Sequence, residues 1–135
     1  MQKLDVWIPL AARPQGSKTA VQRNGKIIMF ESGKNLKKDR LTFSDHLRAV
    51  AQNQQWHIPN NTTPIKVDIT CCFEKPATAI RKFHTIPPDA DKLARFVLDA
   101  CTDAGIWLDD SQVIELTIRK TYDYHTTTRI RITHD

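Results

Sequence analysis

Cysteine is scarce in this 135-residue sequence, which contains three, two of them adjacent at positions 71 and 72. They supply neither a disulfide framework nor the Cys-x-x-Cys spacing of a zinc site. Long apolar runs are also missing, since none approaches the roughly 20 residues that a membrane span requires. The first ten residues hold too short an apolar stretch for a secretory signal peptide. We therefore expect a cytoplasmic protein in a reducing compartment.

The composition is that of a folded globular chain, with 40% hydrophobic and 26% charged residues. The sequence contains no internal repeat and no low-complexity tract. At this length we expect a single domain over residues 1–135, small enough that dimerisation would help to stabilise it.

Positive charge is concentrated near the start of the chain. Residues 13–40 contain eight basic and two acidic residues, a net charge of about +6 compared with +5 for the whole chain. This asymmetry is typical of a face that binds a polyanion, although a solvated lysine-rich surface is the alternative. Together with a basic pair in a later loop, the candidate contacts to a nucleic acid are Arg13, Lys18, Arg23, Lys26, Lys34, Lys37, Lys38, Arg81 and Lys82.

The residue patterns predict an α+β fold with the element order β-ββ-α-β-α-β-β. Asn24-Gly25 indicates the turn of a hairpin, and Gly105 is expected to end the second helix. The last two strands are expected to run antiparallel, in a small mixed or antiparallel sheet covered by two helices. The predicted strands cover 4–10, the hairpin 19–30, 64–73, 113–120 and 129–133; the predicted helices cover 35–56 and 91–104.

A loop of about 15 residues, 74–88, contains three prolines and no periodic pattern. Loops of this length in a compact domain are usually functional or mobile. Arg81 and Lys82, with Phe83 beside them, are suited to holding phosphates and stacking on a base. An ordinary exposed loop is the alternative.

Carboxylates gather at both ends of the second predicted helix, as Asp89 and Asp91 before it and Asp109 and Asp110 after it. A single aspartate there is usually a helix cap or part of a turn, but two pairs around one helix are harder to explain in that way. The returning chain can bring Asp110 near Asp91, provided that the next strand runs beside the helix start. Such a group suits a hard cation such as Mg²⁺. In a basic chain, it indicates an enzyme that cleaves nucleic-acid phosphodiesters.

Arg95 lies four residues after Asp91, on the same face of the helix. It either forms a surface ion pair of little energetic value or faces the scissile phosphate and stabilises charge in the transition state. Asp99, four residues further on, is interpreted as a surface or structural charge and is left out of the site.

The segment DADKLARFVLDACTDAGIWLDDSQV, residues 89–113, resembles the RusA family of Holliday-junction resolvases. The family signature is a D-x-D-[NK]-L-x-K helix start followed by a D-D-x-Q-V return. The early R-P-Q-G-S-K loop and the basic first helix also look like those of phage-borne members. The resemblance implies a homodimeric α+β endonuclease that makes paired nicks in four-way DNA junctions and depends on Mg²⁺, with Mn²⁺ as a second usable ion.

The essential carboxylates of the family fall on Asp89, Asp91 and Asp110, which are therefore the expected catalytic metal ligands, and Asp109 has a lesser role. The catalytic lysine of the family falls on Arg95, where this chain departs from the pattern. Arginine keeps the positive charge but does not donate a proton as lysine can. Activity is expected to survive if the cation acts electrostatically.

Three other functions are open on the sequence alone. The chain could be a DNA-binding or architectural protein without catalysis, in which the carboxylates are caps and turns. It could also be a metal-dependent nuclease that acts on other branched DNA or on RNA, because carboxylate–metal chemistry does not distinguish these substrates. A non-enzymatic interaction module would leave the charge asymmetry unexplained.

Overall fold

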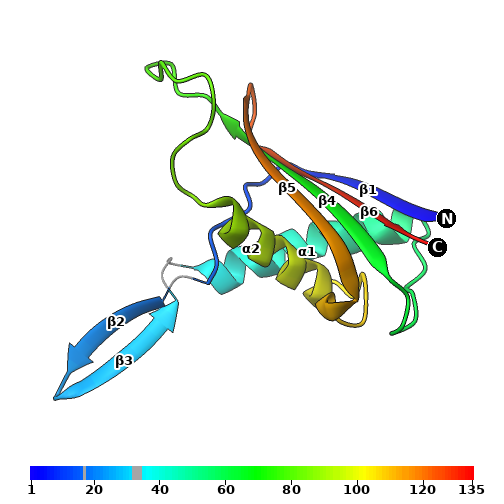
Figure 1. The fold of residues 1–135 in the computed structure, drawn as a ribbon, viewed down its shortest axis with the longest axis horizontal. Coiled ribbons are helices and arrows are strands. Elements are labelled where there is room, and N and C mark those ends of the chain that lie inside the picture. The colour runs from blue at the N-terminus through cyan, green and yellow to red at the C-terminus, as the bar shows by residue number, and fades with distance from the viewer. Residues whose placement is uncertain (17, 32–34) are drawn as a thin grey trace.

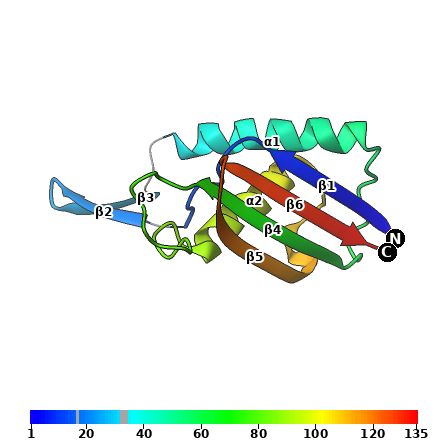
Figure 2. The same cartoon turned by 90° about the horizontal axis from the view of Figure 1, so that it is seen from above.

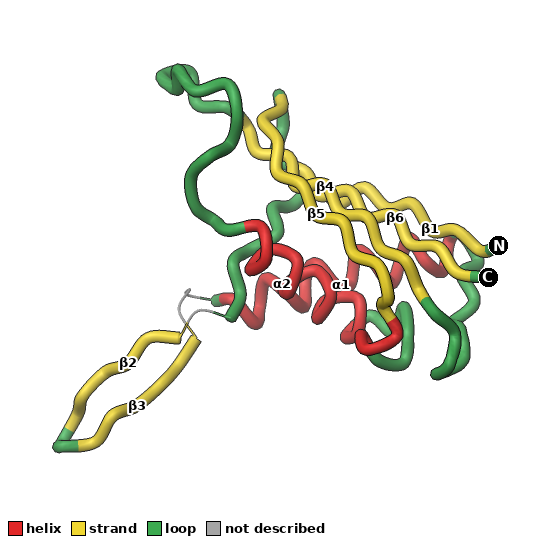
Figure 3. Tube along the Cα trace, in the orientation of Figure 1, coloured by secondary structure: helices red, strands yellow, loops and turns green. Residues whose placement is uncertain are grey.

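A computed structural model of the protein describes residues 1–16, 18–31 and 35–135. The predicted α+β class and element order are confirmed, with one added 3₁₀ turn (Figure 3). The elements are β1 (Gln2–Ile8), β2 (Lys18–Arg23), β3 (Lys26–Glu31), α1 (Leu36–Asn53), β4 (Ile65–Glu74), α2 (Ala90–Asp103), η1 (Asp110–Gln112), β5 (Val113–Asp123) and β6 (Thr127–His134).

Four strands form a mixed sheet in the order β1-β6-β4-β5 (Figures 1 and 2). The last two strands run in opposite directions, as predicted, but β4 lies between them, antiparallel to β6 and parallel to β5. A parallel pair requires a long crossover connection, which α2 supplies here. The link between β5 and β6 is short, which in a sequence indicates that the two strands pair directly. The position of β4 between them could therefore not be predicted from that link.

Both helices pack on one face of the sheet (Figure 2). The alternation predicted for the fourth strand places Ile65, Val67, Ile69 and Cys71 in the core, each no more than 3% exposed. The rings of Phe43 and Phe96 join α1 to α2 edge to face, with centroids 5.3 Å apart. Burial raises the pKa of the Cys71 thiol to about 12, so this cysteine is a core residue and not a nucleophile.

The remaining two strands, β2 and β3, form a separate two-stranded sheet. Their turn is the predicted Asn24-Gly25 pair, with φ of 52° and 74°. Two successive positive φ angles are what a tight hairpin turn of this kind requires. Figure 1 shows the hairpin extending from the end of the domain at which α2 begins. In the described part of the chain, no helix has the length and apolar character needed to cross a membrane.

Candidate active site

The first carboxylate of the predicted site, Asp89, occupies the N-cap position of α2. Its backbone is extended, its carbonyl accepts a hydrogen bond from Leu93 N at 3.2 Å, and its side chain makes no capping hydrogen bond. Its only ion pair with a described residue is with Lys92, at 4.0 Å. Helix capping therefore does not account for this carboxylate, which is exposed and open to a ligand.

The chain leaves α2 through a tightly bonded turn. Gly105, with φ of 73°, donates its N–H to Thr102 O, and Ile106 N donates to Cys101 O at 3.0 Å. These two bonds form a Schellman motif, so the predicted role of Gly105 at the helix end is confirmed. Ile106 and Trp107 are then buried, and Trp107 Nε1 donates to Thr102 Oγ1 at 2.9 Å. This anchoring fixes the direction in which the chain approaches Asp110.

Gln112 holds the return segment in place. Its Oε1 accepts from the N–H groups of Leu108 and Asp109, both at 3.1 Å. Its Nε2 donates to the carbonyls of Asn60 and Thr63 at 2.7 and 3.2 Å. Only 6% of Gln112 is exposed, so these four bonds tie the turn before β5 to the loop before β4. Sequence reasoning missed this residue, although it stands inside the D-D-x-Q-V motif.

Within the acidic pair, the two aspartates differ in their surroundings. Asp109 Oδ2 accepts a hydrogen bond from Ser111 Oγ at 2.5 Å, which gives this side chain a local partner. Asp110 is exposed and makes no hydrogen bond or ion pair with any described residue. The same holds for Asp91 in the first turn of α2. Asp91 and Asp110 are therefore the carboxylates with unused oxygen atoms.

A groove of about 510 Å³ between α2 and β5 brings together three of the predicted site residues, Asp91, Arg95 and Asp110. Asp99 also lines it, and the rest of its lining is apolar, made by Ala90, Ala94, Leu98, Leu116 and Ile118. Asp89 lies outside this groove, in an adjoining hollow that it shares with Pro14, Pro87, Pro88 and Lys92.

The position of Asp110 along the groove differs from the expected one. Because β5 runs parallel to β4, it begins beside the end of α2 and not beside its start. Asp110 therefore enters the groove from the end opposite Asp91. Among the described residues, no three side chains of the metal-binding types are gathered into one cluster. Mg²⁺ commonly binds proteins through only one or two carboxylates and several waters, so a full protein cage is not required.

Arg95 contacts the loop that precedes the hairpin. A Cβ atom built on Gly16 would overlap Nη1 of Arg95 and lie 3.1 Å from its Cζ. Arg95 forms no ion pair with Asp91 or with any other described residue. The surface ion pair considered as its simplest role is therefore absent from the described part, and the guanidinium is available to an anion.

The loop carrying Gly16 is held on α2 by Gln15, which is 4% exposed. Its backbone N–H donates to Lys92 O at 3.1 Å, and its Nε2 donates to Asp99. Its Oε1 accepts from Arg40 Nη1 at 3.0 Å, and Arg40 also pairs with Asp103 at 3.0 Å. Asp99 thus has a structural role beside Arg95. The four-residue spacing of 91, 95, 99 and 103 was the sequence signal for this charged face.

The predicted DNA-contacting residues are dispersed around these elements. Arg13 pairs with Asp39 at 2.7 Å. Lys37 and Lys38 are exposed on α1, Lys26 is exposed at the hairpin turn, and Arg81 and Lys82 are exposed in the loop before α2. Phe83, predicted to stack on a base, is 69% exposed, with Lys82 Nζ 5.7 Å from its ring centre. The side chains of Lys18 and Arg23, and Lys34 as a whole, lie outside the described part of the structure.

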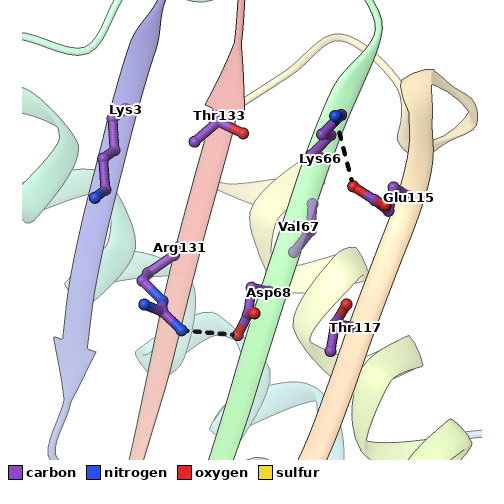
Figure 4. Close-up of a pocket in the computed structure, with 8 residues that line it drawn as sticks. All are labelled: Lys3, Lys66, Val67, Asp68, Glu115, Thr117, Arg131 and Thr133. Carbon is purple, nitrogen blue, oxygen red and sulfur yellow. Dashed lines mark hydrogen bonds and ion pairs between the residues drawn. The ribbon is translucent and has the colours of Figure 1, made fainter.

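The sheet face opposite the helices has a second hollow of about 300 Å³ (Figure 4). Its carboxylates are already paired: Asp68 binds Arg119 at 2.7 Å and Arg131 at 3.4 Å, and Glu115 binds Lys66 at 3.7 Å. Burial alone would raise the pKa of Asp68, but the hydrogen bond and charge of Arg119, with Arg131, hold it below its ordinary value. Because these acidic and basic side chains already pair with one another, this face is a weaker candidate for a metal or phosphate site than the groove.

Comparison with curated proteins finds no significant match. A family model described as endodeoxyribonuclease RusA matches residues 9–133, nearly the whole chain. The match extends well beyond the 25-residue motif and takes in the hairpin, both helices and all of the strands except β1 and the last residue of β6. The resemblance seen in the sequence is therefore confirmed, and the chain belongs to the RusA endodeoxyribonuclease family.

Proposed function

We propose that this protein is a Mg²⁺-dependent endodeoxyribonuclease that resolves four-way DNA junctions by paired, symmetric nicks. The observation that carries the proposal is the groove between α2 and β5, in which two unpartnered carboxylates and an unpaired arginine, among the described residues, line one space. The family match supplies the class of enzyme, and the groove supplies the chemistry.

Asp89, Asp91 and Asp110 would supply the metal ligands, one or two carboxylates to an ion, with waters completing the coordination. Their oxygens are hard donors, all three side chains are exposed, and none is consumed as a helix cap in the described structure. A bound Mg²⁺ lowers the pKa of a coordinated water and neutralises charge on the phosphate. The apolar lining of the groove would limit competing water around the reacting group.

Arg95 would bind the phosphate that is cut. An arginine can offer two parallel N–H donors to phosphate oxygens, and it keeps its charge at any working pH. Such a donor stabilises the negative charge that develops in the transition state. In this proposal, Arg95 acts electrostatically and proton transfer to the leaving oxygen falls to water.

Two symmetric cuts require two active sites, so we propose that the working form is a homodimer with two-fold symmetry. The exposed lysines of α1, Lys37 and Lys38, and the basic loop at Arg81 and Lys82 would contact the junction arms. Contacts of this kind go to phosphates and are sensitive to salt. The resemblance of the early R-P-Q-G-S-K loop and the basic first helix to phage-borne members supports a phage or prophage origin, and the proposed DNA substrate supports a cytoplasmic place of action.

The proposal is tested with an end-labelled synthetic four-way junction in Mg²⁺, compared with linear duplex and with a matched RNA junction. Symmetric nicks in the DNA junction alone are expected. Asp91→Asn and Asp110→Asn should each reduce cleavage at least 100-fold without weakening junction binding in Ca²⁺. Asp45→Asn, which removes an exposed carboxylate on α1 instead, is the matched control.

The alternatives give different results in the same assay. A purely architectural protein would bind the junction without Mg²⁺, cut nothing and be unaffected by Asp91→Asn. Equal cutting of linear duplex or of RNA would reject junction specificity but keep the metal-dependent nuclease. Arg95→Lys should retain most of the cleavage and Arg95→Ala should lose it, because the proposed role requires charge.

A further inference from the structure

The segment that leads into Asp89 is tied to the sheet by a lysine. Lys120 of β5 is partly buried, and its Nζ donates hydrogen bonds to the carbonyl oxygens of Ile86 and Pro88, both at 2.9 Å. Pro88 is the residue immediately before Asp89. One ammonium group therefore holds the backbone immediately before the start of α2, beside the proposed metal ligands.

A side-chain donor is needed there because of the local sequence. Pro87 and Pro88 have no backbone N–H, so their backbone can form hydrogen bonds with the rest of the protein only through the carbonyl oxygens. An ammonium group carries three donors and no acceptor, which suits it to two carbonyls from one short segment. Bonds from a charged donor are also stronger than those between neutral groups.

The rest of this loop has few other attachments. Between Pro76 and Thr85, its backbone hydrogen bonds to described residues are local, and Ile80 is fully exposed. The second anchor is His84, which stacks on Phe73 with ring centres 4.3 Å apart and meets Tyr122 edge to face at 5.1 Å. Tyr122 and Lys120 are alternate residues on the same face of β5, so this strand contacts the loop at both anchor points.

Asp89 has only a weak local partner for its side chain, Lys92, in an ion pair at 4.0 Å. Its backbone is extended, and its side chain makes no capping bond. The orientation of this carboxylate consequently follows the backbone that Lys120 holds. Groups that orient metal ligands in this way commonly change metal affinity by about 10–100-fold when they are removed.

We propose that Lys120 is a positioning residue for the metal site, acting through the Ile86–Pro88 backbone on Asp89 and, through the first turn of α2, on Asp91. This inference rests on the proposed function, because it takes Asp89 and Asp91 as ligands. It assigns Lys120 no contact with DNA and no part in proton transfer. In this proposal, the charge of Lys120 acts on the metal site only through the two carbonyls that it binds.

The first measurement is direct Mn²⁺ binding to the full chain by calorimetry, without DNA. Lys120→Met, which keeps the length of the side chain but removes the donors, should weaken binding by about tenfold or more. Lys120→Arg, which restores donors and charge, should recover most of the affinity. Lys75→Met is the matched control, because Lys75 lies over the Tyr122 ring at 5.8 Å in the same region and binds neither carbonyl.

The second measurement is amide hydrogen exchange, which does not depend on activity. Lys120→Met should speed exchange at residues 84–86 and 89–92, while amides in β4 and α1 keep their wild-type rates. If Lys120→Met does not fold, Lys120→Gln takes its place, since its shorter side chain retains a neutral amide donor group and should give an intermediate loss of Mn²⁺ affinity.

Asp89→Asn separates the failure of this inference from failure of the proposed site. Weaker Mn²⁺ binding in Asp89→Asn together with wild-type binding in Lys120→Met would overturn the role of Lys120 and leave the metal site standing. Wild-type binding in Asp89→Asn would overturn Asp89 as a ligand and the inference with it. Equal weakening in Lys75→Met would show a general effect of charge and would also overturn the inference.

Discussion

The guanidinium of Arg95 lies directly against the backbone of Gly16, in the space that a Cβ atom would otherwise occupy. Gly16 has φ of 100°, a conformation that other residues rarely adopt. Arg95 is the position at which this chain departs from the family signature, and Gly16, which it packs against, has no side chain that would displace it. The loop and the arginine have to be considered together.

Gly16→Ala should reduce junction cleavage at least tenfold, because the added methyl group displaces Arg95 and strains the loop backbone. The backbone strain should also cost about 1–2 kcal/mol of folding free energy. Gly105→Ala is the matched control, since Gly105 also has positive φ but has no atom within 4 Å of an added Cβ. It should lose similar stability and keep its cleavage rate. Equal rates in the two variants, measured on folded protein, would contradict this relationship.

Gln112→Leu should lower the free energy of unfolding by about 2 kcal/mol or more, because it removes the partners of two N–H groups and two carbonyls near the core. Gln112→Glu should cost at least as much, because it keeps the acceptor for Leu108 and Asp109 but buries a carboxylate against the carbonyl oxygens of Asn60 and Thr63. Urea unfolding followed by circular dichroism measures both. A clearly smaller loss in Gln112→Glu than in Gln112→Leu would contradict this and show that the bonds to Leu108 and Asp109 dominate.

Folding stability should fall in mild acid because of His84. Burial lowers the pKa of His84 below its ordinary value of 6.5, and the charge of Lys120 lowers it further. A base with a lower pKa in the folded state binds fewer protons there than in the unfolded chain. The contribution of neutral His84 to the free energy of unfolding is therefore complete above pH 6.5. It is lost as the pH falls from 6.5 toward the folded-state pKa.

Urea titrations at pH 8 and pH 5 measure this loss, and His84→Phe should reduce it while retaining the stack on Phe73. The same substitution at the exposed His57 controls for the added ring. If the difference in stability between the two pH values is the same in His84→Phe and in the wild type, another group is responsible.

Junction binding should depend on salt through the exposed lysines of α1. Lys37→Gln and Lys38→Gln should each weaken binding in Ca²⁺ and lower the slope of log affinity against log salt by about 0.9, if each contacts one phosphate. Lys66→Gln removes a lysine from the opposite sheet face, where it pairs with Glu115, and should leave the slope unchanged. Fluorescence anisotropy over a range of salt concentrations gives these slopes, and an equal effect of Lys66→Gln would place the DNA elsewhere.

Local signals in the sequence predicted most of the fold. Asn24-Gly25 predicted the hairpin turn and Gly105 the end of α2, because each depends on backbone angles that few residues adopt. The alternation of Ile65, Val67 and Ile69 likewise predicted the buried side of β4. Patterns of this kind depend on neighbouring residues and need no knowledge of the tertiary structure.

The remainder depends on contacts between distant segments. Nothing near β5 in the sequence indicates that it pairs with β4 instead of β6, and its course parallel to β4 makes it begin beside the end of α2. The roles of Gln112 and Lys120 could not be predicted, because their partners, the carbonyls of Asn60 and Pro88, are distant in the sequence and meet them only in the fold. The four candidate residues Asp89, Asp91, Arg95 and Asp110 came from the motif, and their roles stay predictions.

The separate pairing of β2 with β3 has a consequence for how members of this family can diverge. An insertion or deletion in this two-stranded arm shifts no register in the four-stranded sheet that supports the groove. The length and charge of the arm can therefore drift between relatives while the cutting chemistry stays constant. An exchange of residues 18–31 between two homologues would transfer preference for one branched DNA over another, if the arm reads the substrate.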